Sequence, residues 1–161
     1  MTETTIDVLA PCGGRVIGLD EVPDPVFAAA MVGPGAAITP DLGVAAMVEA
    51  IAPVAGVVAA MHPHAFVIAG PGGGAHSVLV HLGIDTVQLK GAGFELLAAQ
   101  GDEVVAGQPL VRWSPDDVVA RGMSAIVAVI ALAADAEHLT VTDIEHLDAG
   151  DLLLTWRDIA V

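Results

Sequence analysis

The sequence predicts a mostly β protein, either a sandwich or a partly closed barrel with about ten short strands. Three observations favour this class. Short apolar runs are repeatedly bounded by proline and glycine, two pairs of segments recur at nearly one offset, and only three stretches have a helical pattern. At 161 residues the chain can form one domain that buries roughly 70% of its unfolded surface. We therefore expect a single domain over residues 1–161.

The recurring segments indicate a duplicated β unit. "APCGGRV" at 10–16 returns as "APVAGVV" at 52–58, an offset of 42 residues. "AGQPLVRW" at 106–113 returns as "AGDLLLTW" at 149–156, an offset of 43 residues. Each copy is a turn that leads into a short apolar run, which is the pattern of a strand bounded by breakers.

Short helical turns are predicted at 23–31, 93–100 and 114–122. The last has the clearest signals. Ser114 is a suitable N-cap, Pro115 suits the first helical position, and Asp116 and Asp117 favour the positive end of the helix dipole.

The charge of the chain restricts its partners. Five Lys and Arg residues stand against twenty Asp and Glu residues, a net charge of −15. Such a chain repels phosphate backbones and anionic lipid, so we expect no binding to nucleic acid or to membrane surfaces. A basic protein is a better partner, and its association would be fast and sensitive to salt.

The cytoplasm is the expected location. "MTETTIDVLA" lacks the basic start and long apolar run of a secretion signal, and the single cysteine, Cys12, cannot form an internal disulfide. Residues 42–61 are nearly long enough to span a membrane, but Glu49, Pro53 and Gly56 interrupt them, and the apolar stretch 122–134 is too short. We therefore expect no membrane insertion.

One apolar segment, "VLVHLGIDTVQLKGAGF" at 78–94, contains a histidine followed four residues later by an aspartate. In an extended strand, alternate residues share a face. One face would then be pure core, with Val78, Val80, Leu82 and Ile84. The other would carry Leu79, His81, Asp85 and Val87. Gly83 would leave open space between the imidazole and the carboxylate, giving an apolar patch with a polar centre.

Two interpretations of these polar residues are open at this point. His81 can be a hydrogen-bonded core histidine with Asp85 in a turn. Alternatively, "MHPHAFVI" at 61–68 puts His62 and His64 on one face of another strand, and H-x-H with H-x-x-x-D is a metal-ligand pattern. A structural zinc site would need a closed set of four ligands, and the chain has neither H-E-x-x-H nor a second cysteine.

Several segments resemble the glucose-type IIA component of the bacterial phosphoenolpyruvate-dependent sugar phosphotransferase system. They are "VPDPVFAAAMVGPGAAI" (22–38), "HAFVI" (64–68), "VHLGIDTVQLKGAGF" (80–94) and "GDEVVAGQPL" (101–110). The resemblance covers nearly the whole chain. It implies an all-β fold, an antiparallel β sandwich of the duplicated hybrid type with a few short helical turns.

The resemblance also implies roles for individual residues. His81 matches the histidine that is phosphorylated, and His64 matches the second active-site histidine, which contacts the phosphoryl group. Asp85 and Asp24 match acidic positions bordering the site. An apolar partner surface is implied at Phe27, Met31, Val32, Leu79 and Val87.

The implied reaction is a relay in which the histidine phosphocarrier HPr donates a phosphoryl group that passes on to a sugar-specific IIB or IIBC component. A neutral imidazole suits this reaction because it offers a nucleophilic nitrogen at cytosolic pH. Neither histidine segment contains Lys or Arg close to the histidines, so we expect the partner to supply cationic donors. A transiently used patch favours a monomer.

No cofactor is required, although the resemblance allows a zinc ion held by His64 and His81 with a carboxylate from a partner. His62 and Pro63 replace the residues usual in the family, so His62 is either a third ligand or phosphate donor, or a solvent-exposed substitution for a small polar residue. The loop 69–77 is also longer and richer in glycine than usual. We expect His76, His138 and His146 to be solvated, and Lys90 to be a surface residue without a chemical role.

Two functions from other classes remain as alternatives. A lysostaphin-like zinc peptidase uses H-x-x-x-D and H-x-H, but in the opposite order along the chain. A biotinyl or lipoyl carrier module has a segment similar to "GDEVVAGQPL", but needs a lysine at a hairpin tip. Nothing in the sequence selects the sugar among glucose, N-acetylglucosamine, β-glucosides and sucrose.

Overall fold

The computed structural model describes residues 2–70 and 75–160, and these ranges contain fourteen strands and five short helical segments. The glycine-rich loop 69–77 therefore lies partly outside the described residues. The strands are β1 (Thr2–Leu9), β2 (Gly14–Gly18), β3 (Gly35–Pro40), β4 (Val48–Ile51), β5 (Gly56–His62), β6 (Ala65–Ala69), β7 (Ser77–Leu82), β8 (Phe94–Leu96), β9 (Glu103–Val104), β10 (Pro109–Trp113), β11 (Val127–Ala131), β12 (Leu139–Val141), β13 (His146–Leu147) and β14 (Leu152–Ala160).

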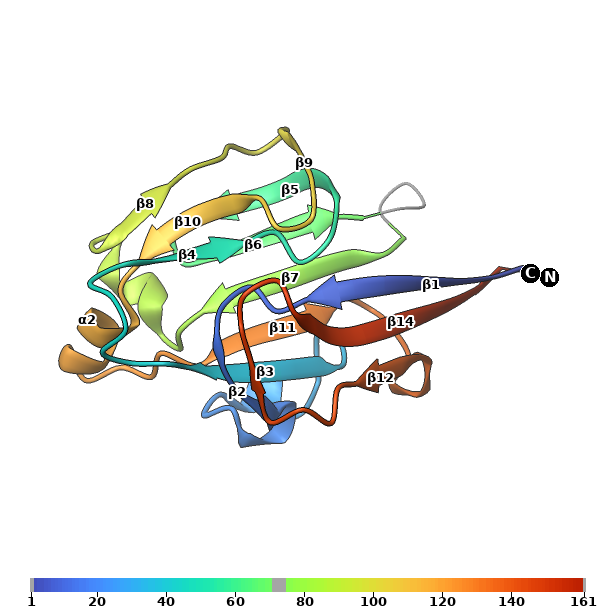
Figure 1. Cartoon of the computed structure of the whole chain (residues 1–161), viewed down its shortest axis with the longest axis horizontal. Coiled ribbons are helices and arrows are strands. Elements are labelled where there is room, and N and C mark those ends of the chain that lie inside the picture. Colours follow the sequence, from blue (N-terminus) through green and yellow to red (C-terminus); the bar gives the residue numbers. More distant parts are fainter. Residues whose placement is uncertain (1, 71–74, 161) are drawn as a thin grey trace.

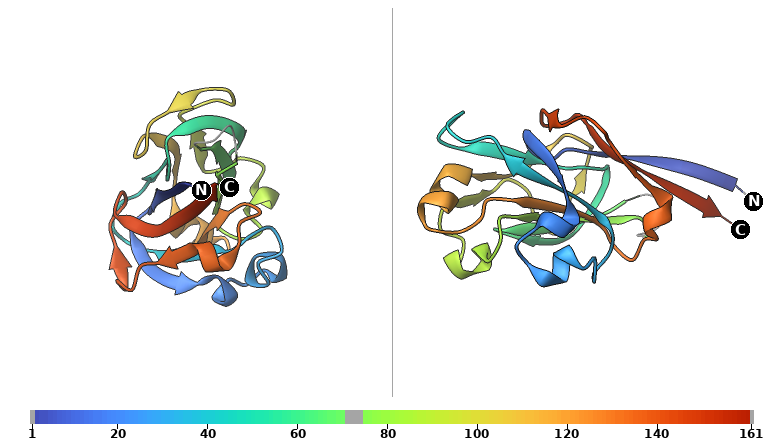
Figure 2. Two further views of the ribbon diagram at one scale, coloured as in Figure 1. Left: turned by 90° about the vertical axis from the view of Figure 1, so that its right-hand side faces the viewer. Right: turned by 90° about the horizontal axis from the view of Figure 1, so that it is seen from below.

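The strands form three antiparallel sheets (Figure 1). The largest has the order β13-β2-β3-β11-β7-β6-β5-β9, and the two smaller ones have the orders β4-β10-β8 and β1-β14-β12. In the end view of Figure 2 the strands surround the interior of the molecule. The predicted all-β sandwich is confirmed, with more strands than the sequence indicated.

The main core joins all three sheets. It includes Val8 from β1 and Trp156 from β14, Trp113 from β10, and Phe66 and Val80 from the large sheet, all at most 5% exposed. A second, smaller cluster of buried side chains lies on the other side of the large sheet and comprises Leu19, Val22, Phe27, Ala37, Ile84, Ala128 and Ile130. Phe27 of this second cluster packs against the ring of His81.

Backbone hydrogen bonds confirm the duplicated unit. Leu9 N donates to Pro53 O, and its counterpart 42 residues later, Ile51 N, donates to Pro11 O. Ala10 N donates to Asp151 O, and equivalently Ala52 N donates to Gln108 O. The two copies of the repeated turn therefore lie side by side and exchange bonds across a pseudo-twofold axis.

The helical segments are η1 (Leu19–Glu21), α1 (Pro25–Ala28), η2 (Thr86–Leu89), α2 (Pro115–Ala120) and η3 (Ala136–His138). The predicted cap of α2 is confirmed, since Ser114 Oγ accepts a hydrogen bond from Asp117 N at 3.0 Å. Within the described part of the chain, no helix has the length and hydropathy needed to cross a membrane.

The helical prediction for 93–100 was wrong. Residues Phe94–Leu96 form strand β8, which pairs with β10 so that Phe94 lies opposite Trp113. Their rings stack with centroids 5.9 Å apart, and this packing outweighs the helical preference of Glu95 and Leu96.

Candidate functional site

His81 lies on β7, a strand with one buried face and one partly open face. Val78, Val80 and Leu82 are at most 1% exposed, whereas Leu79 and His81 are partly buried. The predicted alternation is therefore confirmed as far as Leu82. It places the imidazole on the side of the sheet opposite the main core.

After Leu82 the predicted extended strand is wrong. Gly83 has φ +77°, Asp85 adopts the left-handed conformation at φ 63°, and η2 follows. The bend carries Ile84 into the second cluster with Phe27, instead of the main core. Gly83 does not leave open space either, because a Cβ there would lie 2.6 Å from Thr86 Cγ2 and 2.9 Å from Ser124 O.

The Gly83 bend determines the protonation of the His81 ring. His81 Nδ1 lies 2.6 Å from the Gly83 carbonyl oxygen. A carbonyl can only accept a hydrogen bond, so Nδ1 carries the proton and the neutral ring leaves Nε2 with a free lone pair. Phe27 packs on the same ring with centroids 5.1 Å apart.

His64 is positioned by a turn and not by a strand. His62 is the last residue of β5, and Pro63 and His64 form the turn that leads into β6, so the predicted strand carrying His62 and His64 on one face was wrong. Ala65 pairs with His81 across β6 and β7, and Leu82 N donates to His64 O at 2.7 Å. This register sets the His64 and His81 rings edge to face, 5.2 Å apart.

His62 is exposed, and its ring lies 5.9 Å from that of His64. Over residues 2–70 and 75–160, the three potential metal ligands that lie within 4.8 Å of one another are Asp135, Glu137 and His138. His62, His64 and His81 therefore do not form a ready-made three-ligand metal site. His64 and His81 are adjacent imidazoles and fit two positions of a tetrahedral zinc site, whose other ligands would have to come from outside.

Burial keeps both rings neutral near pH 7. Desolvation is the largest cause that lowers the pKa of His81, and the Gly83 carbonyl, Asp24 and Asp85 oppose it only in part. Desolvation also lowers the pKa of His64, and the neighbouring His81 and His62 lower it further. Each ring therefore favours its uncharged form.

The two acidic residues occupy different settings. Asp24 caps α1, and its Oδ1 accepts hydrogen bonds from Val26 N at 2.9 Å and Phe27 N at 3.4 Å. Asp85 is exposed in the turn after β7. Asp85 also borders a groove of about 400 Å³ whose wall includes Arg121, a cation that the sequence did not indicate because it lies in a distant segment.

The residues predicted to form an apolar surface differ in burial. Met31, Val32 and Val87 are exposed and Leu79 is partly buried. Phe27 is only 9% exposed and belongs to the second cluster, where it packs against the His81 ring. Val26, which precedes Phe27 on α1, is 42% exposed and was not among the residues named from the sequence.

The remaining histidines differ in environment. The expectation that His76 is solvated was wrong, since it is 7% exposed and its ring lies 4.9 Å from that of Trp156. His146 is exposed and lies 2.7 Å from Asp41 Oδ2, and His138 is partly buried. Lys90 is exposed at the end of η2.

Comparison with known proteins identifies the class. The family described as "phosphoenolpyruvate-dependent sugar phosphotransferase system, EIIA 1" matches residues 6–136, so the chain is a phosphotransferase component. It belongs to this EIIA family and is a phosphoryl-carrier IIA component of a sugar phosphotransferase system. A solved structure, the glucose permease IIA from Mycoplasma capricolum, is 35% identical, with a TM-score of 0.84 over 94% of this chain and 96% of that chain.

The two alternative functions are not favoured. The peptidase would need a third ligand beside His64 and His81, and no such triad is present among the described residues. The carrier module would need Lys90 at a hairpin tip, but Lys90 follows a 3-10 helix.

Proposed function

We propose that His81 carries the phosphoryl group and that Nε2 is the atom that accepts it. The single observation that carries this assignment is the 2.6 Å contact between His81 Nδ1 and the Gly83 carbonyl oxygen, which leaves Nε2 unprotonated. In the transfer, the lone pair of Nε2 forms the new N–P bond while the N–P bond of the donor breaks, and the electron pair of that bond returns to the donor imidazole. No net proton is released.

His64 is proposed to donate a hydrogen bond to the phosphoryl oxygens. Its ring faces that of His81 at 5.2 Å, and a neutral imidazole still has one N–H. Asp24 and Asp85 are proposed to orient the site, Asp24 by holding α1 and Phe27 against the His81 ring. Because phosphoryl transfer depends on positioning and on stabilisation of charge, these contacts suit the reaction.

HPr is the proposed donor and a IIB or IIBC component the proposed acceptor, as the family implies in general. Both would dock on the surface of Met31, Val32, Leu79 and Val87, with Phe27 beneath it. Residues 1–161 are proposed to act as one EIIA domain, a monomer in the cytoplasm, since the main core draws on both ends of the chain. No cofactor is needed. Zinc would require a ligand from a partner.

The test is phosphorylation with phosphoenolpyruvate, enzyme I and HPr. The unaltered protein is expected to gain one acid-labile phosphate, and His81→Gln is expected to gain none. His146→Gln is the matched control, since that imidazole is exposed and remote in sequence. Equal labelling of His81→Gln and the unaltered protein would refute the assignment.

A further inference from the structure

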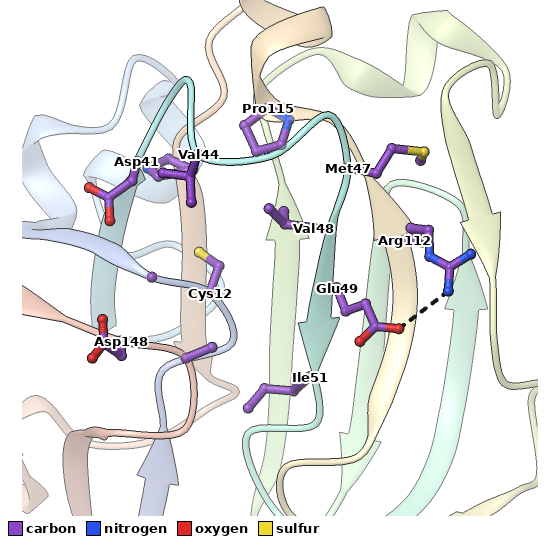
Figure 3. Close-up of a pocket in the computed structure, with 13 residues that line it drawn as sticks. Cys12, Asp41, Val44, Met47, Val48, Glu49, Ile51, Arg112, Pro115 and Asp148 are labelled. Carbon is purple, nitrogen blue, oxygen red and sulfur yellow. Dashed lines mark hydrogen bonds and ion pairs between the residues drawn. The ribbon is translucent and has the colours of Figure 1, made fainter.

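A cavity in the described part of the chain lies apart from the histidines. Its volume is about 650 Å³, within the range of small-molecule sites. It opens between the sheet β4-β10-β8 and the β13, β2 and β3 end of the large sheet (Figure 3). His62, His64, His81 and the apolar partner surface do not line it.

Its walls combine apolar surface with charge. Val44, Met47, Val48 and Ile51 supply an apolar side from β4 and the preceding connection. Val44 and Met47 are 72% and 40% exposed, so this connection presents apolar side chains at the mouth instead of burying them. An apolar part of a ligand would find its surface here.

Carboxylates dominate the charged part of the cavity. Asp41 and Asp148 lie on one side and Glu49 with Arg112 on the other (Figure 3). Arg112 donates to Glu49 at 3.5 Å and to Glu95 at 3.2 Å, so its charge is already matched. Asp41 accepts from His146 at 2.7 Å. No partner of the Asp148 carboxylate is found in the described residues.

The Cys12 thiol lies at the boundary between the main core and this cavity. It is 3% exposed, lines the cavity, and has no hydrogen bond within the described part of the chain. Figure 3 shows its sulfur turned toward the space between Asp41 and Val44. Burial raises the pKa of Cys12 to about 12, with Asp41 contributing, so the thiol is a neutral group at this acidic end.

We propose that this cavity binds a small organic cation, an ammonium or guanidinium group joined to an apolar body. The cationic head lies between Asp41 and Asp148, and the body lies against Val48 and Ile51. An anionic ligand is disfavoured because three carboxylates face one guanidinium that is already paired. The net charge of −15 on the whole chain also attracts a cationic ligand and repels an anionic one.

Three probes with one apolar body test the proposal: 4-phenylbutylamine, 4-phenylbutanol and 4-phenylbutyrate. Each is titrated into ¹⁵N-labelled protein and followed by amide shifts. The amine is expected to give saturable shifts at residues 12–13, 41–49 and 148–149, and to bind about fivefold or more tightly than the alcohol, with the carboxylate weakest. Equal affinity of the three probes, or shifts elsewhere, would overturn the proposal.

Matched variants locate the site. Asp148→Asn is expected to weaken amine binding about fivefold and leave alcohol binding unchanged, because Asp148 makes no side-chain bond that the fold needs. Glu103→Gln, on β9 at the far edge of the large sheet, removes the same charge and is expected to change nothing. Similar effects of both variants would show a general charge effect and refute the site.

Two further experiments test the shape of the cavity and the kind of ligand. Ala149→Leu adds carbon atoms to the cavity wall at an exposed position and is expected to abolish amine binding while the far amide shifts stay native. The tripeptide acetyl-Leu-Lys-Leu-amide offers the same ammonium as part of a peptide. Binding of this peptide without binding of the free amine would overturn the small-molecule assignment.

Discussion

A single hydrogen bond decides which nitrogen of His81 can react. Because Nδ1 donates to Gly83 O, the neutral ring presents Nε2, and burial lowers the pKa of the ring below its usual value of about 6.5. The ring is therefore neutral near pH 7 and gains a proton only in more acidic solution. Phosphoryl acceptance should be independent of pH above about 6.5 and fall below the pKa of His81.

The same shift predicts a dependence of stability on pH. Between the folded pKa of His81 and about 6.5, the unfolded chain binds more protons than the folded one, so the free energy of unfolding decreases as pH falls through this window. The measurement is urea unfolding from pH 7.5 to 5, with His81→Gln as the control that lacks this contribution. An NMR pKa for His81 at or above 6.5 would contradict both predictions.

His64 is expected to affect the transfer more than the fold. His64→Gln should still accept phosphate, but its onward transfer to a IIB domain should slow by about a hundredfold, the effect of removing one donor to the transition state. Quenched-flow measurement of both half-reactions separates the steps. His138→Gln serves as the control, and a normal onward rate in His64→Gln would reduce His64 to a structural role.

At the scale of elements, the α1 cap links local structure to the site. Asp24→Ala removes both hydrogen bonds to α1 and should cost about 1 kcal/mol in the free energy of unfolding. Asp24→Asn keeps an acceptor and should cost less. Both variants should lower the pKa of His81, because the Asp24 charge raises it. Thermal unfolding and NMR titration measure the two effects, and equal stability of the Ala and Asn variants would show that the cap does not stabilise α1.

The bend at Gly83 is the second element that positions the histidine. Gly83→Ala combines φ +77° with a Cβ crowded by Thr86 and Ser124, so we expect a loss of about 2–3 kcal/mol and a displaced Gly83 carbonyl. Gly101→Ala is the matched control, because Gly101 has φ +95° but open space around a Cβ, and should lose about 1 kcal/mol. Urea unfolding measures the free energy of unfolding of both variants. Equal losses of stability would mean that the structure accommodates the added Cβ at Gly83 without a cost in free energy.

Elements that follow from local pattern could be predicted from the sequence, and those decided by distant contacts could not. The alternation of Val78, Val80 and Leu82 and the Ser114 cap depend on neighbouring residues, and both are confirmed. Strand β8 depends on pairing with Trp113, and the bend after Leu82 on bonds from Gly83 N to Ile126 O and from Ile84 N to Ser124 O. These partners lie 19 to 43 residues away, so no local window contains them.

The features of the candidate site also divide into those that the sequence predicted and those that depend on distant contacts. The resemblance brought His64 and His81 together, and their predicted adjacency agrees with the β6–β7 register. Arg121 and the cavity of Cys12 were missed because each depends on segments that only the folded sheets bring together. At the scale of the whole molecule, the repeat offsets of 42 and 43 residues predicted a duplicated β unit, and the equivalent backbone hydrogen bonds of its two copies agree with that prediction.

The net charge of the whole molecule predicts how it associates with HPr, the proposed donor. Five cationic side chains against twenty acidic ones attract a basic surface over distances longer than any single contact, and salt screens this attraction. The second-order rate of phosphoryl transfer from phospho-HPr should therefore fall about fivefold between 50 and 500 mM NaCl. Phosphoramidate, a small anionic donor, is the control: screening weakens its repulsion from the acidic protein, so its rate should not fall. If the transfer rates from both donors fell equally, salt would be acting on the folded protein itself and not on its association with HPr.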